Sequence, residues 1–166
     1  MALATGVSLE EYLHTNYEPD CDYVDGVLEE RNVGQLDHGE TQAAIAAFFF
    51  RLKRRLAIRV VTELRMRVSP TRVRIPDVAI VAVENRDQVL QRPPLLCIEI
   101  LSPDDRLGRI AKVIADYLDF GVPMIWIVDP YKHEAFVVTQ EDRAMRLVDT
   151  LQWKDVIINL SEIFPE

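Results

Sequence analysis

Two apolar segments that each carry a single carboxylate constrain the fold of this chain more than any other feature. Residues 74–81 read Arg-Ile-Pro-Asp-Val-Ala-Ile-Val and contain Asp77, while residues 95–103 read Leu-Leu-Cys-Ile-Glu-Ile-Leu-Ser-Pro and contain Glu99. Short apolar runs rich in β-branched residues predict buried strands. A buried carboxylate without a partner costs several kcal/mol, so such groups persist when they are paired, hydrogen-bonded or bound to a metal. The two segments therefore predict a shared acidic site.

Asp77 and Glu99 carry the oxygen ligands that a hard divalent cation prefers. Mg²⁺ is typically held by one or two carboxylates together with waters and substrate phosphate oxygens. The alternative interpretation is that each acid caps its strand or pairs with a nearby arginine. The spacing alone leaves both interpretations open.

Length and composition limit the class of protein. A chain of 166 residues suits one domain, here expected to span residues 1–166, and can bury a core without disulfides. No apolar run approaches the roughly 18 residues of a membrane span, and Met1–Ser8 lacks the features of a secretory signal. Cys21 and Cys97 lack metal-ligand spacing. We expect a soluble cytoplasmic protein without a membrane partner, a zinc site or a disulfide framework.

Charge is distributed unevenly along the chain. The net charge is −8, yet residues 51–74 hold nine basic side chains and one acid, Glu63. This asymmetry is typical of a local phosphate-binding surface on an acidic protein. It predicts nucleic-acid contacts from four residues in particular: Arg54, Arg55, Arg65 and Arg67. A solvated helix end beside an edge hairpin would give the same count.

Local signals predict a mixed set of elements. Ser8 and Glu11 form a capping box that begins a short helix, and Asp25-Gly26 predicts the turn of an N-terminal β-hairpin. Helical spacing predicts a helix over residues 37–56 with Asp37 as its N-cap. Residues 58–68 and 73–83 read as an antiparallel pair of strands, followed by a surface loop over 84–94.

The second half of the chain predicts a strand–helix–strand unit. The central strand 95–101 precedes a helix capped by Asp104 or Asp105 and ended by Gly121. The apolar run 124–128 suits a strand parallel to the first. Beyond it we expect a peripheral hairpin over 134–139 and 145–149 and a terminal helical turn over 160–164.

Several common catalytic motifs are absent from the sequence. It contains no GxGxxG, GxxxxGK[ST] or GxSxG pattern, which excludes the usual dinucleotide, P-loop and serine-hydrolase signatures. His38, one of three histidines, lies at a predicted helix start. It could cap the helix, support a ligand or contact a substrate.

The order of these segments resembles the αβββαβ core of the PD-(D/E)XK nucleases and, more specifically, the Uma-type restriction endonuclease family. The matching segments cover nearly the whole chain: residues 22–26, His38, residues 63–68, 74–78, 98–103, 117–123 and 126–130. The resemblance implies an α/β, restriction-endonuclease-like fold with a mixed central sheet, an N-terminal β-hairpin and a C-terminal peripheral hairpin. It also implies a phosphodiesterase site in which Asp77 and Glu99 bind Mg²⁺ or Mn²⁺.

The chain departs from the superfamily pattern at the catalytic lysine. The position two after Glu99 is Leu101, and the position on the following helix where family members carry the lysine is Val113. Lys112 is one residue earlier, turned by about 100° around the helix, and its long side chain could still assist catalysis. Glu40 is the candidate for an acid from the first core helix, with Asp22 and Asp25 as alternatives.

The leading hypothesis is a metal-dependent endonuclease acting on DNA, with Lys112 assisting and His38 near the substrate. Such enzymes are often homodimers, because cutting both strands of a duplex needs two sites. The alternative is a catalytically impaired nuclease-fold module that binds nucleic acid or a protein partner. A third hypothesis is an assembly protein whose basic segment lies in a homodimer interface.

Overall fold

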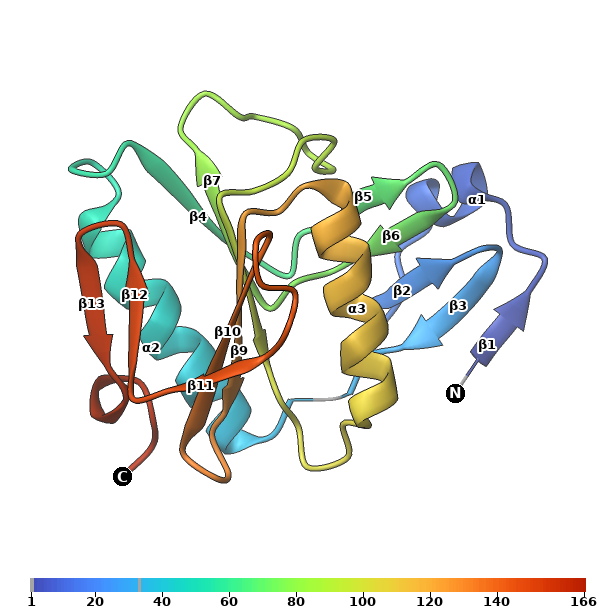
Figure 1. Ribbon diagram of the computed structural model, residues 1–166. Helices are drawn as coiled ribbons and strands as arrows, with labels where there is room; N and C mark the ends of the chain where they lie inside the picture. The colour runs from blue at the N-terminus through green and yellow to red at the C-terminus, as the bar shows by residue number, and fades with distance from the viewer. Residues whose placement is uncertain (1, 33) are drawn as a thin grey trace.

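A six-stranded mixed sheet forms the centre of the molecule (Figure 1). The computed structural model describes residues 2–32 and 34–166. Strands β8 (Leu96–Ile100) and β9 (Met124–Asp129) are parallel and are joined by a crossover through helix α3 (Leu107–Phe120). Every other pairing in this sheet is antiparallel. In spatial order the strands are β11 (Arg146–Val148), β10 (Glu134–Thr139), β9 (Met124–Asp129), β8 (Leu96–Ile100), β7 (Val78–Ala82) and β4 (Ile58–Thr62).

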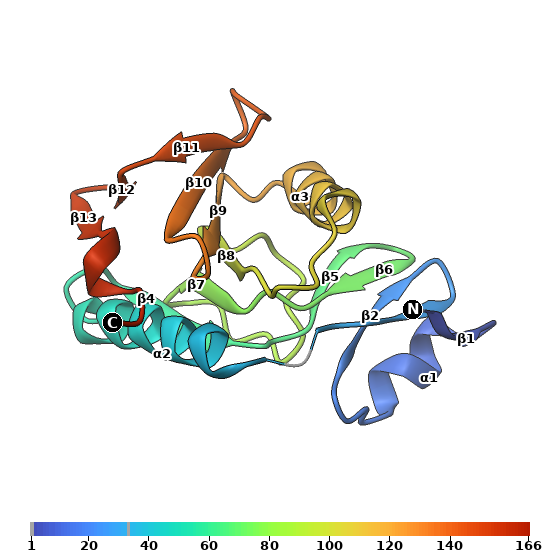
Figure 2. The same ribbon diagram turned by 90° about the horizontal axis from the view of Figure 1, so that it is seen from below.

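Two helices cover opposite faces of this sheet: α2 (Leu36–Leu52) and α3 (Leu107–Phe120). Figure 2 shows them on either side of β7, β8 and β9. Side chains alternate between the faces of a strand, and β8 follows this rule. Leu96 and Ile98 belong to the same buried cluster as Phe49 of α2, whereas Cys97 belongs to the cluster of Val113 on α3. The two apolar layers explain why the central strands contain almost no polar residues.

A second sheet, with helix α1 (Leu9–His14), lies to one side of the central sheet (Figures 1 and 2). The predicted hairpin is present, and Asp25 and Gly26 have φ angles of 52° and 89°, as a two-residue turn of this kind requires. Ser8 accepts a hydrogen bond from the backbone N–H of Glu11, which confirms the predicted N-cap of α1. In spatial order the strands are β1 (Ala2–Thr5), β3 (Val27–Glu30), β2 (Cys21–Val24), β6 (Arg72–Arg74) and β5 (Met66–Ser69).

The prediction of two continuous strands over 58–68 and 73–83 is wrong. Each segment is divided, so β4 and β7 pair in the central sheet while β5 and β6 pair in the second sheet. The division occurs at Glu63, whose φ of 52° turns the chain, and at Ile75-Pro76. The backbone N–H of Glu63 bonds to the carbonyls of Pro76 and Asp77, which holds the two bends together. The antiparallel pairing was predicted correctly, but one chain segment serves two sheets.

Two predicted helix caps are also wrong. Helix α2 begins at Leu36 with Gln35 as its N-cap, so Asp37 lies inside the first turn, and the helix ends at Leu52 rather than at residue 56. Helix α3 has Arg106 as its N-cap, while Asp105 accepts a hydrogen bond from the backbone N–H of Ser102. The helix ends at Gly121, as predicted, with a left-handed φ of 106°.

The C-terminal segment packs against the α2 side of the central sheet (Figure 1). The predicted hairpin of β10 and β11 extends the edge of the sheet, and the predicted final turn is a short 3₁₀-helix, η1 (Leu160–Glu162). A further hairpin of β12 (Thr150–Trp153) and β13 (Val156–Asn159) was not predicted. Within the described residues, no helix has both the length and the apolar character needed to span a membrane.

Candidate active site

Asp77 and Glu99 lie side by side on the α3 face of the central sheet. Val78 pairs with Ile98 in the antiparallel ladder between β7 and β8, so Asp77 and Glu99 are opposite each other one position further along. Opposed residues of an antiparallel pair share one face. Both are buried, with exposed fractions of 5% and 6%. Burial and the neighbouring charge of Asp77 raise the pKa of Glu99 to about 8.

Three groups surround the carboxylate of Asp77. Arg31 donates from Nη2 to Oδ1 at 3.0 Å, and the backbone N–H of Ile100 donates to Oδ2 at 2.8 Å. The Nε2 atom of His38 lies 3.4 Å from Oδ2. The contact with Asp77 raises the pKa of His38, so protonation of the imidazole is favoured there. Arg31, which follows strand β3, therefore joins the second sheet to the acidic pair.

Glu99 has a different partner, from helix α3. The hydroxyl of the fully buried Tyr117 donates to Oε1 of Glu99 in a short hydrogen bond. This bond opposes the effect of burial on the pKa of Glu99. Because Tyr117 also packs in the α3 core cluster, it fixes the Glu99 carboxylate relative to the helix.

Gln42 of helix α2 supports the site from the opposite side. Its Nε2 donates to the backbone carbonyl of Asp77 at 2.9 Å and lies 3.5 Å from Oε1 of Glu63. Gln42 is four residues after His38, so both side chains lie on the same helix face. Sequence reasoning missed Gln42 and Arg31. The helical spacing from His38 is a signal for Gln42, whereas the role of Arg31 depends on how the two sheets meet.

Asp22 and Asp25, the predicted alternatives to Glu40, are each paired with an arginine. Asp22 is 1% exposed and accepts from Nη1 of the equally buried Arg74 at 3.0 Å, while Arg74 Nε donates to Asp116 of α3 at 2.8 Å. Glu29 binds the same guanidinium at 2.9 Å. Asp25 pairs with Arg72 at the hairpin turn. This network joins β2, β3, β6 and α3 behind the site.

Glu40 and Lys112 are both exposed. Lys112 lies on α3 beside an open pocket of about 680 Å³ between β3 and α3, whereas Val113 is buried in the α3 core cluster. The same pocket is lined by Arg109, one turn before Val113 on the helix. The structure therefore brings Asp77, Glu99 and His38 together but places Lys112 and Glu40 at the surface.

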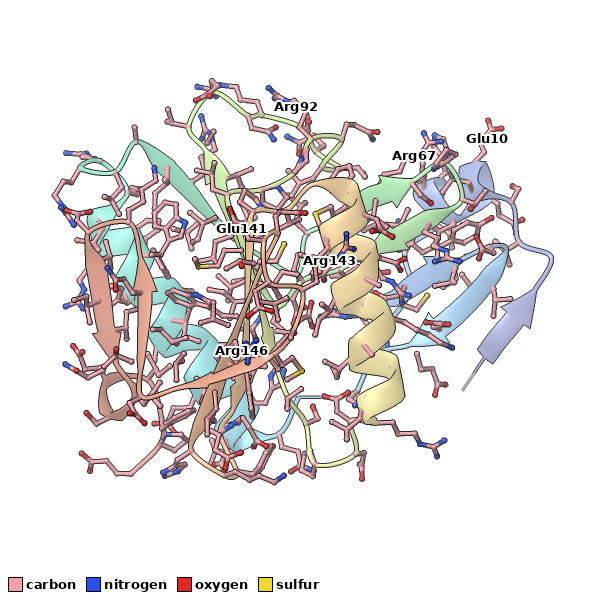
Figure 3. The ribbon with its side chains drawn as sticks, viewed as in Figure 1. Glu10, Arg67, Arg92, Glu141, Arg143 and Arg146 are labelled. Atoms are coloured by element: carbon pink, nitrogen blue, oxygen red, sulfur yellow. The ribbon has the colours of Figure 1, made fainter. Side chains whose placement is uncertain are left out.

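The four arginines predicted to bind nucleic acid lie away from the acidic pair. Arg54 and Arg55 follow the C-terminal end of α2, about 24 Å along the helix from the end that carries His38. Arg55 pairs with Asp155. Arg65 binds Asp20 and two backbone carbonyls, and Arg67 projects from β5 at the upper edge in Figure 3. Their contact with nucleic acid stays a prediction.

The donor set at Asp77 and Glu99 suits a divalent cation. Asp77 already pairs with Arg31, as the alternative interpretation of the sequence expected, whereas Glu99 has no arginine partner among the described residues. A cation between the two carboxylates would relieve the repulsion that helps to raise the pKa of Glu99. Over residues 2–32 and 34–166 there is no group of three or more histidine, cysteine, aspartate or glutamate side chains able to hold a metal ion. Two carboxylates match the number that Mg²⁺ typically takes from a protein.

Comparison with known proteins places the chain in a family. The sequence profile of the family Uma2, described as "Putative restriction endonuclease", matches residues 9–166. This chain belongs to that family. The fold is similar to the crystal structure of a "putative nuclease belonging to DUF820" from Anabaena variabilis, with a TM-score of 0.84 and 21% sequence identity. The alignment covers 95% of this chain and 97% of the other. A search of the curated proteins found no match.

Proposed function

We propose that this Uma2-family protein is a divalent-cation-dependent endonuclease that hydrolyses phosphodiester bonds in DNA. The observation that carries the proposal is the register of β7 and β8, which sets the buried carboxylates of Asp77 and Glu99 opposite each other. The restriction endonuclease family to which the chain belongs supports a nuclease rather than another hydrolase.

Asp77 and Glu99 would hold Mg²⁺ or Mn²⁺. A cation bound there would lower the pKa of a water and withdraw charge from the attacked phosphate. The carboxylates would bind it in their ionised form, so Glu99 must lose the proton that burial favours. Tyr117 and the backbone N–H of Ile100 orient the two carboxylates through their hydrogen bonds.

His38 and Arg31 supply positive charge beside Asp77. Both touch the carboxylate that would hold the cation, and His38 Nδ1 has no partner among the described residues. We propose that His38 lies near the substrate and positions Asp77 through Nε2, since its Nδ1 atom is buried. Gln42 fixes the backbone at Asp77.

Lys112 and Glu40 remain candidates for assisting groups, and Arg54, Arg55, Arg65 and Arg67 for contacts to the DNA backbone. Glu40, Lys112, Arg54 and Arg55 are exposed, Arg65 and Arg67 are partly exposed, and Arg65 pairs with Asp20. The surface position of Lys112 favours the alternative hypothesis, a nuclease-fold module that binds nucleic acid and cuts it slowly or not at all.

Plasmid DNA tests the proposal. The purified protein should nick supercoiled plasmid with Mg²⁺ or Mn²⁺ and not with EDTA. Asp77→Asn and Glu99→Gln should each lower the rate by at least about 10²-fold, because each removes charge that holds the cation. Glu141→Gln, which changes an exposed acid in the turn between β10 and β11 (Figure 3), is the matched control and should cut like the native protein.

Circular dichroism and thermal unfolding should show that the variants remain folded. Nucleic acid left intact under all cation conditions, with no Mg²⁺ or Mn²⁺ binding by calorimetry, would contradict the proposal. Salt-sensitive DNA retention with cation binding but without cleavage would select the binding module instead.

A further inference from the structure

Helix α3 brings the guanidinium of Arg109 to the buried Asp22, whereas Lys112 stays at the surface. Arg109, Val113 and Tyr117 are spaced by four residues and therefore lie on one helix face. Tyr117 bonds to Glu99 and Val113 is buried, whereas Lys112, which lines the same pocket as Arg109, is exposed. Burial raises the pKa values of both Glu99 and Asp22, and the positive charge of Arg109 opposes that rise.

The guanidinium of Arg109 is held loosely. Its Nη2 lies 3.5 Å from Asp22 and its Nη1 lies 3.5 Å from Asp105, both at the outer limit of a hydrogen bond. Its Nε atom is buried without a partner among the described residues. Arg74, in contrast, makes three charge-assisted hydrogen bonds of 2.8–3.0 Å. Arg109 therefore retains donors that a ligand could satisfy.

Arg109 also has an approach from solvent. Its side chain is 26% exposed and lines the pocket between β3 and α3. The other charged side chains of this pocket are two basic ones, Arg106 and Lys112, and four acidic ones, Glu29, Glu30, Asp104 and Asp105. Asn32 lies in the wall of this pocket and is the neighbour of Arg31, which bonds to Asp77. The pocket is thus reached by the segment that carries Arg31, and Arg109 connects it to the buried Asp22.

A phosphate that approaches two buried acids needs a positively charged side chain at close range. A guanidinium offers two parallel N–H donors to phosphate oxygens, so it suits this contact better than a distant surface charge. We propose that Arg109 contacts the scissile phosphate, with the strand entering along the pocket between β3 and α3. This inference rests on the proposed function. It assigns to Arg109 the role of the lysine that related nucleases carry at the positions of Leu101 or Val113.

Cleavage by matched variants tests this role. Arg109→Ala should lower the Mg²⁺-dependent rate by about 10²–10³-fold, and Arg109→Lys should recover part of the loss because it restores the charge. Lys112→Ala, from the same helix and pocket, should lose far less. Arg143→Gln, which removes an exposed arginine paired with Asp119 of α3 (Figure 3), should not change the rate. A loss in Lys112→Ala equal to that in Arg109→Ala would overturn the inference.

Binding measurements separate a phosphate contact from a structural role. With Ca²⁺ in place of Mg²⁺, Arg109→Ala should bind a short DNA duplex several-fold more weakly, with a salt slope reduced by about one. Its affinity for Mg²⁺ alone should be unchanged or higher, since a cation near the acids is removed. Weaker Mg²⁺ binding would indicate that Arg109 merely positions the acids and would overturn the inference.

The two proposals can fail separately. If the native protein cleaves DNA and Arg109→Ala cleaves equally well, the proposed function stands and the inference fails. If the native protein binds DNA without cleavage, the duplex measurement still decides, because unchanged affinity and salt slope in Arg109→Ala would refute the contact. If Arg109→Ala unfolds, Arg109→Gln replaces it in both experiments.

Discussion

At the scale of single residues, Glu99 shows how one position combines opposing demands. Burial and the charge of Asp77 favour the protonated form, while Tyr117, Arg31 and Arg109 favour the carboxylate. The pKa of about 8 places the change of charge near neutral pH. Glu99 is therefore the group through which pH should affect both cation binding and stability.

Cation binding should depend on pH. Below about pH 8 a cation must displace the Glu99 proton, so Mg²⁺ affinity should rise with pH up to that value, by at most about tenfold per unit. Calorimetry in buffers of different ionisation enthalpy should detect proton release at pH 7. Glu141→Gln should behave like the native protein. Affinity that does not change between pH 6 and 8.5 would contradict the assignment.

Without a bound metal, the contribution of Glu99 to stability should decrease as pH rises, whereas the affinity for Mg²⁺ should increase. The pKa of Glu99 in the folded protein lies above its ordinary value of 4.5, so the folded state binds more protons between about pH 4.5 and 8. The contribution of Glu99 to the free energy of unfolding should therefore fall as pH rises through that window. Urea unfolding of Glu99→Gln should lack this fall, and a pH profile identical to that of the native protein would refute it.

Arg74 should be the arginine most important for stability. It is 1% exposed and bonds to Asp22, Asp116 and Glu29. Among the described residues, Arg74→Met would leave the buried Asp22 with only the 3.5 Å ion pair to Arg109 and would leave Asp116 with only that to Arg72. We expect a loss of about 3–5 kcal/mol in the free energy of unfolding. Arg55→Met, which removes an exposed pair with Asp155, should cost at most about 1 kcal/mol. Equal losses by chemical denaturation would contradict this expectation.

At the scale of elements, turns with positive φ decide where helices and strands end. Asp25-Gly26 sets the hairpin, Glu63 divides a segment between two sheets, and Gly121 ends α3. The first and last follow from Asp-Gly and Gly signals in the sequence. Glu63 is not a residue type that favours a left-handed turn, and its bend depends on hydrogen bonds to Pro76 and Asp77.

Gly121 should be intolerant of alanine. Its φ is 106°, and an added Cβ would lie 3.3 Å from the ring of Pro93, so Gly121→Ala should destabilise the protein by about 1–3 kcal/mol. Gly39→Ala is the control, because Gly39 lies in α2 with nothing within 4 Å of the added atom. That substitution should stabilise by about 0.5–1 kcal/mol. Thermal unfolding should show a lower transition temperature for Gly121→Ala and a higher one for Gly39→Ala than for the native protein.

At the scale of the whole molecule, the site lies where the central sheet, its two covering helices and the segment after β3 meet. The central sheet supplies Asp77 and Glu99, the helices supply His38 and Tyr117, and the segment after β3 supplies Arg31. The Arg74 network ties the second sheet to α3. Such buried ionic links between elements should make their unfolding cooperative.

The chain should therefore unfold as one domain. Scanning calorimetry should give a single transition with equal calorimetric and van't Hoff enthalpies. Arg74→Met should lower the transition temperature more than Arg55→Met, which removes only a surface ion pair. Two separate transitions in the native protein would indicate that the sheets fold independently.

The sequence by itself determined the apolar strands, the Asp-Gly hairpin, the end of α3 and the two acids, because these depend on local periodicity and turn chemistry. The tertiary structure decided that one chain segment serves two sheets and that β7 and β8 set Asp77 opposite Glu99. It also decided where the basic side chains lie: Arg31 reaches Asp77 from another sheet, and α3 brings Arg109 to Asp22 while Lys112 is exposed. Register and helix rotation are set by long-range packing, so neighbouring residues in the sequence carry little information about them.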